Sequence, residues 1–226
     1  MTADEQPEPR SVVRPLVAVL DYGIGNLHSA QKAIETMGAD ARLTTDPGLI
    51  ADADGVVLPG VGAFGACMNT LRATGLAQPA LDAVASGRPF LGICVGMQML
   101  FDASDEDRAV TGLGVIPGTV RWIPPGVKRP QMQWNRLALR LPDDPLLAGL
   151  GDDPWVYFVH SLHGVPDDPA VVAATCEYGT TLNAAFRIGN VFATQFHPEK
   201  SGPTGLRLLA NFVGVCADGT VRGGTR

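Results

Sequence analysis

The chain has 226 residues and carries 17 Lys and Arg against 23 Asp and Glu, which gives a net charge of −6 at pH 7. This balance argues against nucleic-acid binding, because contact with a phosphate backbone needs a positive surface that releases counterions. The sequence has no run of about 18 uncharged apolar residues, so it predicts no membrane span. Hydrophobic residues at 46% and charged residues at 18% are typical of a globular chain with a buried core.

The two ends of the chain differ in composition from its middle. Residues 1–14 are acidic and bear prolines, without the basic start and apolar stretch of a secretory signal, so we interpret them as a disordered extension. Residues 15–217 are predicted to form one domain, and residues 218–226 a polar tail. The cysteines show no Cys-x-x-Cys spacing, which favours free thiols in a reducing cytoplasm. They are Cys67, Cys94, Cys176 and Cys216.

The first half of the domain alternates short apolar runs with segments of helical periodicity. Residues 16–20 form the first apolar run, and apolar residues at helical spacing follow between Asn26 and Gly38. Such alternation indicates a mainly parallel sheet, because each parallel crossover needs a helix to return the chain. Further strands are expected at 41–43, 55–58 and 90–93, and further helices at 66–72 and 77–86.

After about residue 112 the pattern changes to strands separated by turns. The last two predicted strands are joined only by Ile188, Gly189 and Asn190, which favours antiparallel pairing. A final helix is expected from Ser201, with Pro203 in its first turn. The predicted fold class is therefore α/β, a mainly parallel central sheet flanked by helices with a β-rich C-terminal half. The strands expected in this half are 115–123, 137–141, 156–159, 171–176, 182–187 and 191–196.

The segment around Cys94 is the strongest candidate for chemistry. An apolar strand runs into Gly92-Ile93-Cys94-Val95-Gly96 and then into a helix. Small residues two before and two after a nucleophile are typical of a sharp strand-to-helix turn, which larger side chains would block. The thiol would then lie at a helix N-terminus, where unpaired N–H groups stabilise thiolate. The alternative is a structural cysteine buried beside packing glycines.

His197 is the best candidate for a proton partner among the four histidines, which also include His28, His160 and His163. An extended backbone would place His197 and Glu199 on the same face, and Pro198 is expected to keep this segment out of helix. The carboxylate would then orient the imidazole as the third group of a Cys/His/acid triad. In isolation the same residues would also fit an ordinary histidine beside a solvated glutamate.

The glycine-rich segment after the strand at 55–58 is a candidate oxyanion site. Gly60 and Gly62 leave the backbone free to turn an N–H outward, and the amide of Val95 would supply a second donor. The alternative is a tight turn with no chemical role.

Five segments together carry a resemblance to a known family. They read DYGIGNL at 21–27, PGVGAF at 59–64, GICVGMQ at 92–98, YFVHS at 157–161 and QFHPEKS at 195–201. From Val17 to Phe212 the chain closely resembles the glutaminase subunit of imidazole glycerol phosphate synthase, a class I (triad) glutamine amidotransferase of histidine biosynthesis. The cysteine turn and the His-Pro-Glu motif are typical of the whole superfamily, and the other three segments narrow the resemblance to this subunit.

The resemblance implies a flavodoxin-like class I glutamine amidotransferase fold and hydrolysis of glutamine by a triad of Cys94, His197 and Glu199. It implies no metal and no other cofactor, and a heterodimer with a (β/α)-barrel cyclase subunit that receives the ammonia. Glu106, in the acidic run 102–107, would hold the α-amino group of glutamine, and Trp134 and Lys200 would face the cyclase. The residues implied around glutamine and its oxyanion are Gly60, Val61, Gly62, Val95, Gln98, His160 and Ser161.

Two places depart from the family pattern. Gln131 and Gln133 stand where the family usually has a histidine and a glycine in Pro-His-Met-Gly-Trp-Asn, and Leu162 stands where tyrosine is common. None of these residues belongs to the implied triad, so the departures bear on the partner interface and its signal to the active site.

Several other functions fit the sequence less well. The nearest enzyme alternative is a glutaminase subunit of another synthase, such as pyridoxal phosphate synthase, and a further alternative is a non-catalytic interaction module of the same fold. The segment Gly23-Ile24-Gly25 lacks the third glycine of a dinucleotide fingerprint, and His160 and His163 have no cysteine or acidic cluster to complete a metal site. The chain has one concentration of basic residues, which fits either a solvated face or a docking surface for an acidic partner. Its members are Arg121, Lys128, Arg129, Arg136 and Arg140.

Overall fold

The computed structural model describes residues 14–223. The extension predicted over residues 1–14 therefore lies outside the described residues, apart from Arg14. That residue is held in place, since its guanidinium Nη2 donates to the carbonyl of Ala39 at 2.7 Å. The prediction of a disordered extension is thus wrong for its last residue, which a hydrogen bond ties to the domain.

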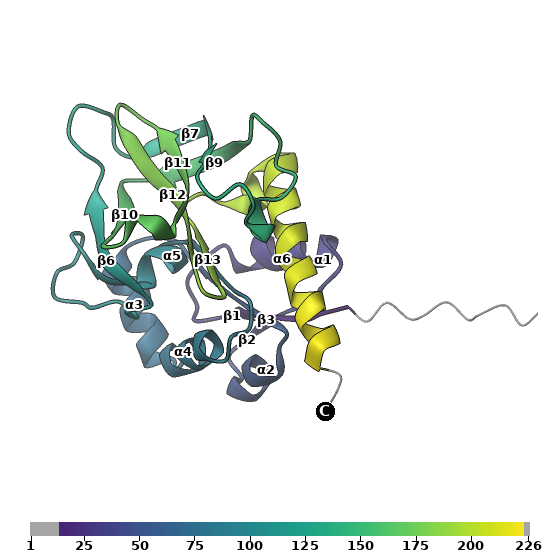
Figure 1. Cartoon of the computed structure of the whole chain (residues 1–226). Helices are drawn as coiled ribbons and strands as arrows, with labels where there is room; N and C mark the ends of the chain where they lie inside the picture. Colours follow the sequence, from purple (N-terminus) through teal and green to yellow (C-terminus); the bar gives the residue numbers. More distant parts are fainter. Residues whose placement is uncertain (1–13, 224–226) are drawn as a thin grey trace, which may run out of the picture.

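An eight-stranded mixed sheet forms the centre of the fold (Figure 1). Its strands are β1 (Leu16–Leu20), β2 (Asp40–Thr44), β3 (Gly55–Gly60), β4 (Phe90–Cys94), β8 (Ala138–Leu139), β11 (Val172–Glu177), β12 (Thr181–Ile188) and β13 (Val191–Thr194). They are ordered β2-β1-β3-β4-β13-β12-β11-β8. The first five in this order run parallel, which confirms the α/β class and the mainly parallel sheet expected from the apolar runs.

Helices cover both faces of the parallel part of the sheet. They are α1 (Leu27–Thr36), α2 (Pro47–Asp52), α3 (Phe64–Ala73), α4 (Ala77–Ala85), α5 (Val95–Met99) and α6 (Gly202–Gly223). Figure 1 shows α6, in yellow, beside α1 on one side, with α2, α3 and α4 on the other. A strand covered on both faces must be apolar on both, and β3 and β4 are buried at every position.

The β-rich second half adds two small sheets to the central one. Their strands are β5 (Phe101–Ser104), β6 (Ile116–Trp122) and β10 (Leu162–Pro166) in one, and β7 (Gln131–Arg136) and β9 (Trp155–His160) in the other. The pairs β6–β10, β7–β9, β11–β12 and β12–β13 are antiparallel, as predicted, whereas β5 pairs with β6 in parallel. The hairpin across residues 188–190 is present, with Ile188 paired to Val191.

Four elements were not predicted from the sequence: α2, β5, β7 and β10. Helix α2 is only six residues long, although it carries a recognisable start, with Pro47 at its first position and the Asp46 side chain accepting from the amide of Gly48 at 2.9 Å. Strand β7 is mostly polar and mostly exposed, so hydrophobic alternation gives no signal for it. These are short or solvent-facing elements that tertiary pairing stabilises.

The final helix extends further than its composition suggests. Helix α6 continues to Gly223, so most of the polar tail predicted at 218–226 is helical. Gly219 keeps a φ outside the left-handed region, so it does not end the helix. Within residues 14–223 we find no helix that has both the length and the apolar character to cross a membrane.

Candidate active site

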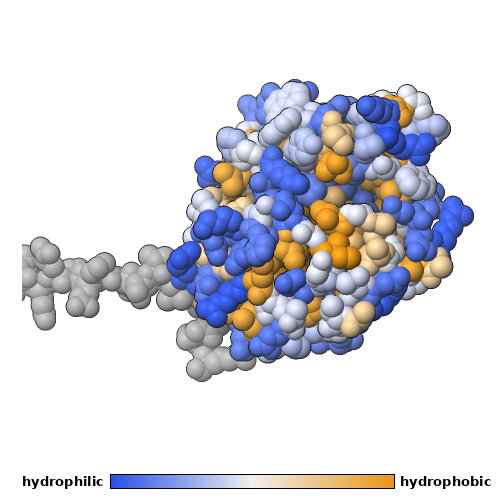
Figure 2. Space-filling model, turned by 180° about the vertical axis from the view of Figure 1, so that it is seen from behind, coloured by the Kyte–Doolittle hydropathy of each residue, from blue (hydrophilic) through white to orange (hydrophobic). Residues whose placement is uncertain are grey.

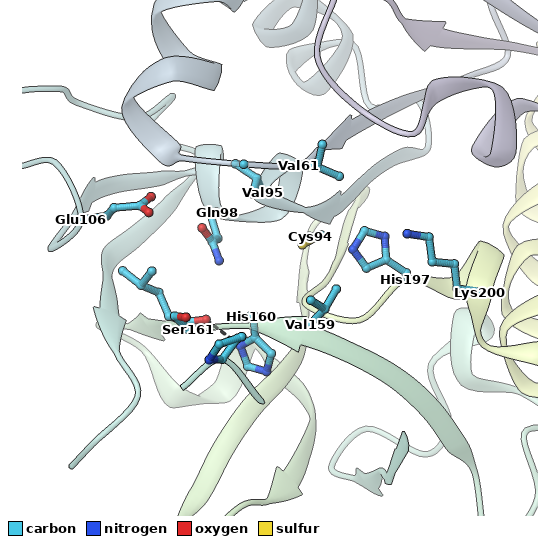
Figure 3. A pocket seen from close by; sticks show the side chains of 13 residues that line it. Val61, Cys94, Val95, Gln98, Glu106, Val159, His160, Ser161, His197 and Lys200 are labelled. Carbon is cyan, nitrogen blue, oxygen red and sulfur yellow. Dashed lines mark hydrogen bonds between the residues drawn. The ribbon is translucent and has the colours of Figure 1, made fainter. Parts of the chain in front are cut away.

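Cys94 ends strand β4, and helix α5 begins at the next residue. Its φ of 54° and ψ of −113° make it the one non-glycine residue with positive φ in the part of the chain that the structure describes. Such a backbone costs a non-glycine residue about 1–3 kcal/mol, and strain of this kind clusters at functional sites. The turn places the sulfur on the wall of a cavity (Figure 3), although Cys94 is only 4% exposed.

The glycines on either side of Cys94 make this turn possible. A Cβ at Gly96 would overlap the carbonyl oxygen of Leu58 and lie 2.7 Å from its carbonyl carbon. A Cβ at Gly92 would lie 3.0 Å from Cα of Met97, at the far side of the turn. The small residues that the sequence places two before and two after Cys94 are therefore needed for close approach of backbone to backbone.

His197 and Glu199 form a buried pair beside Cys94. The ring nitrogen Nδ1 lies 2.8 Å from Oε1 of Glu199, and both side chains are 3% exposed. Figure 3 shows the ring beside the sulfur of Cys94. The expectation of an extended backbone here is wrong, since Pro198–Lys200 form a short 3₁₀ turn. The fixed φ of proline suits the first position of such a turn, so Pro198 starts it.

The surroundings of His197 favour its protonated form. Burial alone would lower the pKa of the imidazole, but its hydrogen bonds to Cys94 and Glu199 outweigh burial and raise the pKa to about 9. At neutral pH the ring is therefore an imidazolium held between a carboxylate and a sulfur, which is the charge distribution that favours a thiolate.

This pKa predicts a pH-dependent contribution to stability. Because the pKa of His197 rises from 6.5 to about 9 on folding, its contribution is complete below pH 6.5 and is lost as the pH rises through 9. As the pH rises through this range, the free energy of unfolding should fall by up to about 3 kcal/mol. Urea unfolding at pH 6 and pH 9.5 measures the difference, which should shrink in His197→Gln and persist in His28→Gln, whose ring is exposed. An equal pH dependence in wild type and His197→Gln would contradict the assignment.

The cavity beside Cys94 has a volume of about 270 Å³. Figure 3 shows Glu106 and Lys200 at its opposite ends, with Gln98, Cys94 and His197 between them. Segments from both halves of the chain contribute, because β9 and β10 lie across the space from the end of β4. The lining residues are Val61, Gly62, Cys94, Val95, Gln98, Glu106, Pro130, Val159, His160, Ser161, Leu162, His197 and Lys200.

Most of the residues predicted to surround glutamine line this cavity. Glu106 does so, and its Oε2 also accepts from the backbone amide of Phe64 at 2.6 Å, which fixes the carboxylate at the start of α3. Gln98 is buried, and its Nε2 donates to Oε1 of Gln195 at 3.1 Å. A carboxylate at one end and a nucleophile near the other suit a small amino acid with a cationic amino group.

Gly60 is the exception among the predicted glutamine-binding residues. It is absent from the cavity lining, and a Cβ there would lie 2.7 Å from the amide nitrogen of Gly96 and 2.8 Å from the hydroxyl of Tyr22. In the structure Gly60 lets β3 approach the Cys94 turn, and its place around the substrate stays a prediction. Val61 and Gly62 do reach the cavity, and Gly62 has a φ of 93°.

Sequence reasoning did not single out Gln195. This residue is fully buried, and its Nε2 lies 3.8 Å from Sγ of Cys94. With Gln98 it forms a short chain of amides that ends at the sulfur. A polar residue two positions before the His-Pro-Glu motif was the available signal.

The two residues predicted to face a partner lie on the surface. Trp134 is 48% exposed and meets the ring of Tyr157 edge-on at 6.0 Å between centroids. Lys200 is exposed at the rim of the cavity, next to the triad residues. A partner seated on these side chains would therefore lie close to the reacting sulfur.

Across residues 14–223, no group of three or more His, Cys, Asp and Glu side chains is arranged to hold a metal ion. His160 and His163 are both buried, and burial lowers the pKa of each to about 4. Cys67, Cys94, Cys176 and Cys216 form no disulfide in the part of the chain that the structure describes.

The fold and the arrangement around Cys94 are those of a triad glutamine amidotransferase. A family model described as glutamine amidotransferase class-I matches residues 18–215. Among solved structures, PurLQS from Thermotoga maritima matches with a TM-score of 0.71 at 20% identity, over 89% of this chain and 98% of that one. A crystal structure described as glutamine amidotransferase matches with a TM-score of 0.70 at 22% identity, over 88% of this chain and 98% of that one. These two solved structures share the fold of this chain.

Sequence relatives narrow the assignment. The imidazole glycerol phosphate synthase subunit HisH of Synechococcus sp. (strain JA-3-3Ab) is 52% identical over 200 residues, 87% of this chain and 92% of that protein. The HisH subunit of Syntrophotalea carbinolica is 50% identical over 204 residues, 87% of this chain and 98% of that protein. The chain belongs to the class-I glutamine amidotransferases and, within them, to the HisH family, which confirms the family resemblance found in the sequence.

Proposed function

We propose that this chain hydrolyses glutamine to glutamate and ammonia as the glutaminase subunit of imidazole glycerol phosphate synthase, in histidine biosynthesis. The observation that carries the proposal is Cys94, held in a strained turn on a cavity wall beside a His197 that pairs with Glu199. Relatives at about half identity that are named as HisH support the choice of synthase.

Catalysis begins from the pair in which the proton of Cys94 already resides on His197, because the imidazolium form of this ring is favoured at neutral pH. The thiolate attacks the side-chain amide carbon of glutamine, and the carbonyl oxygen becomes an oxyanion. His197 then gives its proton to the leaving nitrogen, the C–N bond breaks, and ammonia departs to leave a thioester on Cys94. Glu199 keeps the imidazole oriented and stabilises its cationic form throughout.

A water molecule completes the cycle. His197 removes a proton from this water as it attacks the thioester, and the proton passes to sulfur as glutamate leaves. Backbone N–H groups of Val95 and of the Val61–Gly62 turn are the proposed oxyanion donors. The amide of Val95 is free for this role because the first N–H groups of a helix have no partner within the helix.

Glutamine is held by the rest of the cavity. The carboxylate of Glu106 is the proposed partner for the α-amino group, at the end of the cavity away from His197 (Figure 3). Gln98, His160 and Ser161 contribute from the walls between. This arrangement directs the side-chain amide of the substrate toward Cys94.

The proposed partner is a (β/α)-barrel cyclase subunit that uses ammonia to form imidazole glycerol phosphate and an aminoimidazole carboxamide ribotide. Ammonia is protonated in water and then loses its nucleophilicity, so delivery through an enclosed passage requires the two subunits to be in contact. Figure 2 shows apolar side chains gathered near the middle of one face of the molecule, and large exposed apolar residues are typical of interaction surfaces. Trp134 and Lys200 are proposed to face the cyclase. Cysteines that form no disulfide support a cytoplasmic location as part of this proposal.

Co-purification with the cyclase, followed by a glutaminase assay with and without it, tests this function. We expect a stable heterodimer that releases glutamate and passes its ammonia to the cyclase reaction. Glutamine hydrolysis without any association would instead favour a glutaminase of another synthase. Association without hydrolysis by the heterodimer, in the presence of the cyclase substrate, would favour a non-catalytic interaction module.

A further inference from the structure

A buried polar pair outside the triad joins His160, in the wall of the cavity, to a residue behind that wall. Gln131 on β7 and His160 on β9 are directly paired in the strand register. Gln131 is fully buried, and His160 is 6% exposed. The ring nitrogen Nε2 of His160 lies 2.9 Å from Oε1 of Gln131, and Nδ1 lies 2.7 Å from the carbonyl oxygen of Leu162.

The bond to Leu162 decides which nitrogen of His160 carries the proton. A backbone carbonyl can only accept, so Nδ1 must donate to it. Burial lowers the pKa of His160 to about 4, against the smaller opposing effect of the bond to Leu162, so the ring is neutral at pH 7. A neutral imidazole has one N–H only, and Nε2 is therefore an acceptor.

An acceptor at Nε2 requires a donor from Gln131. With Oε1 toward the ring, two acceptors would face each other. Half a turn of the carboxamide about its last bond brings Nε2 of Gln131 to the ring and Oε1 toward Cys176, whose Sγ is 4.0 Å from the amide. Burial raises the pKa of the Cys176 thiol to about 12, so it keeps its proton and can donate.

One chain of hydrogen bonds then links the four groups. The thiol of Cys176 donates to Gln131, Gln131 donates to His160, and His160 donates to the carbonyl of Leu162. The last of these bonds closes the bend between β9 and β10, where Ser161 lies between His160 and Leu162. Three consecutive residues of this bend, 160–162, line the cavity beside Cys94.

We propose that Gln131 is a positioning residue for glutamine binding: by donating to Nε2 it fixes His160 in the Nδ1–H form and thereby holds the bend at residues 160–162 against the substrate. Gln131 acts through His160 and touches neither the substrate nor Cys94.

The first test reads the proton positions directly. In ¹⁵N-labelled protein at pH 7, imidazole nitrogen shifts of His160 should show a protonated Nδ1 and an unprotonated Nε2. In Gln131→Glu, a carboxylate replaces the donor and cannot donate when ionised, so His160 should become an imidazolium or lose this signature. A wild-type ring protonated at Nε2, or no change in Gln131→Glu, would overturn the assignment.

The second test separates substrate binding from chemistry in the heterodimer with the cyclase. Gln131→Met keeps the length of the side chain and removes the donor, so KM for glutamine should rise about tenfold while kcat stays within about twofold, the effect of one lost buried hydrogen bond. Gln78→Met, at an exposed amide on α4, is the matched control and should match wild type.

The positioning role of Gln131 rests on the proposed function, but the second test can tell failure of one from failure of the other. A variant that merely unfolds loses kcat in proportion to its unfolded fraction and keeps its KM, so a fall in kcat at unchanged KM would overturn the positioning role. Unchanged kinetics in Gln131→Met would also overturn it. An inactive wild type would instead refute the glutaminase activity and leave the nitrogen shifts as the test of Gln131.

Discussion

Replacement of Cys94 by Ala should reduce glutamine-dependent synthesis by the heterodimer by about 10⁴-fold or more, since removal of a catalytic nucleophile has effects of this size. Synthesis from added ammonium salt at high pH should continue at the wild-type rate. The reason is that Cys94 forms the thioester, whereas free ammonia bypasses the glutaminase step. The measurement is the rate of product formation with each nitrogen source.

Cys216→Ala is the control for this experiment. Cys216 is also a buried cysteine outside any disulfide, but it lies in α6 and does not line the cavity. It should retain activity with both nitrogen sources, at a modest cost in stability. Loss of ammonia-dependent synthesis in Cys94→Ala would show that the cysteine supports the assembly or the cyclase, and would refute the division of labour between subunits.

Gly96→Ala should have the second largest effect. Its new Cβ would overlap the carbonyl oxygen of Leu58 and lie 3.1 Å from the carbonyl carbon of Pro59, so α5 must move away from β3. The movement displaces Cys94 and the Val95 amide together. Because a misplacement of about 1 Å costs about 100-fold in rate, glutaminase activity should fall at least that far. Stability should also fall, as measured by urea unfolding.

A matched glycine on α6 separates backbone crowding from a general effect of the substitution. Gly214 is exposed and lacks a positive φ, and a Cβ added there would have no atom within 4 Å. Gly214→Ala should therefore stabilise the protein by about 0.5–1 kcal/mol, the usual gain for a helix interior, and leave activity unchanged. A fully active Gly96→Ala would contradict the role given to the close approach at Leu58.

The parallel part of the fold was predictable because its physical signal is local. Strands buried on both faces read as continuous apolar runs, so β1, β3 and β4 could be located from the sequence within one or two residues. Strand β7 could not, because its residues are mostly polar and only pairing with β9 makes it a strand. The order of the strands likewise depends on contacts that no local pattern records.

The site was predictable to the extent that its motifs are contiguous. The Cys94 turn and the pairing of His197 with Glu199 each lie within a few residues of sequence. The contact of Gln195 with Cys94 and that of Gly60 with Gly96 join separate segments, so their roles emerged only from the fold. The pairing of Cys94 with His197 also joins distant segments, and it was predictable because a thiolate needs a proton partner and His197 has a carboxylate two residues away; the family resemblance supported the same choice.

The central claim is that Cys94 is an accessible nucleophile in a glutamine-binding cavity. Incubation of the heterodimer with a thiol-reactive glutamine analogue, followed by mass spectrometry of its peptides, tests this claim most directly. We predict one added analogue, located on the peptide that contains Cys94, with protection by excess glutamine. Absence of label on Cys94, or equal labelling of Cys67, Cys176 and Cys216, would contradict it.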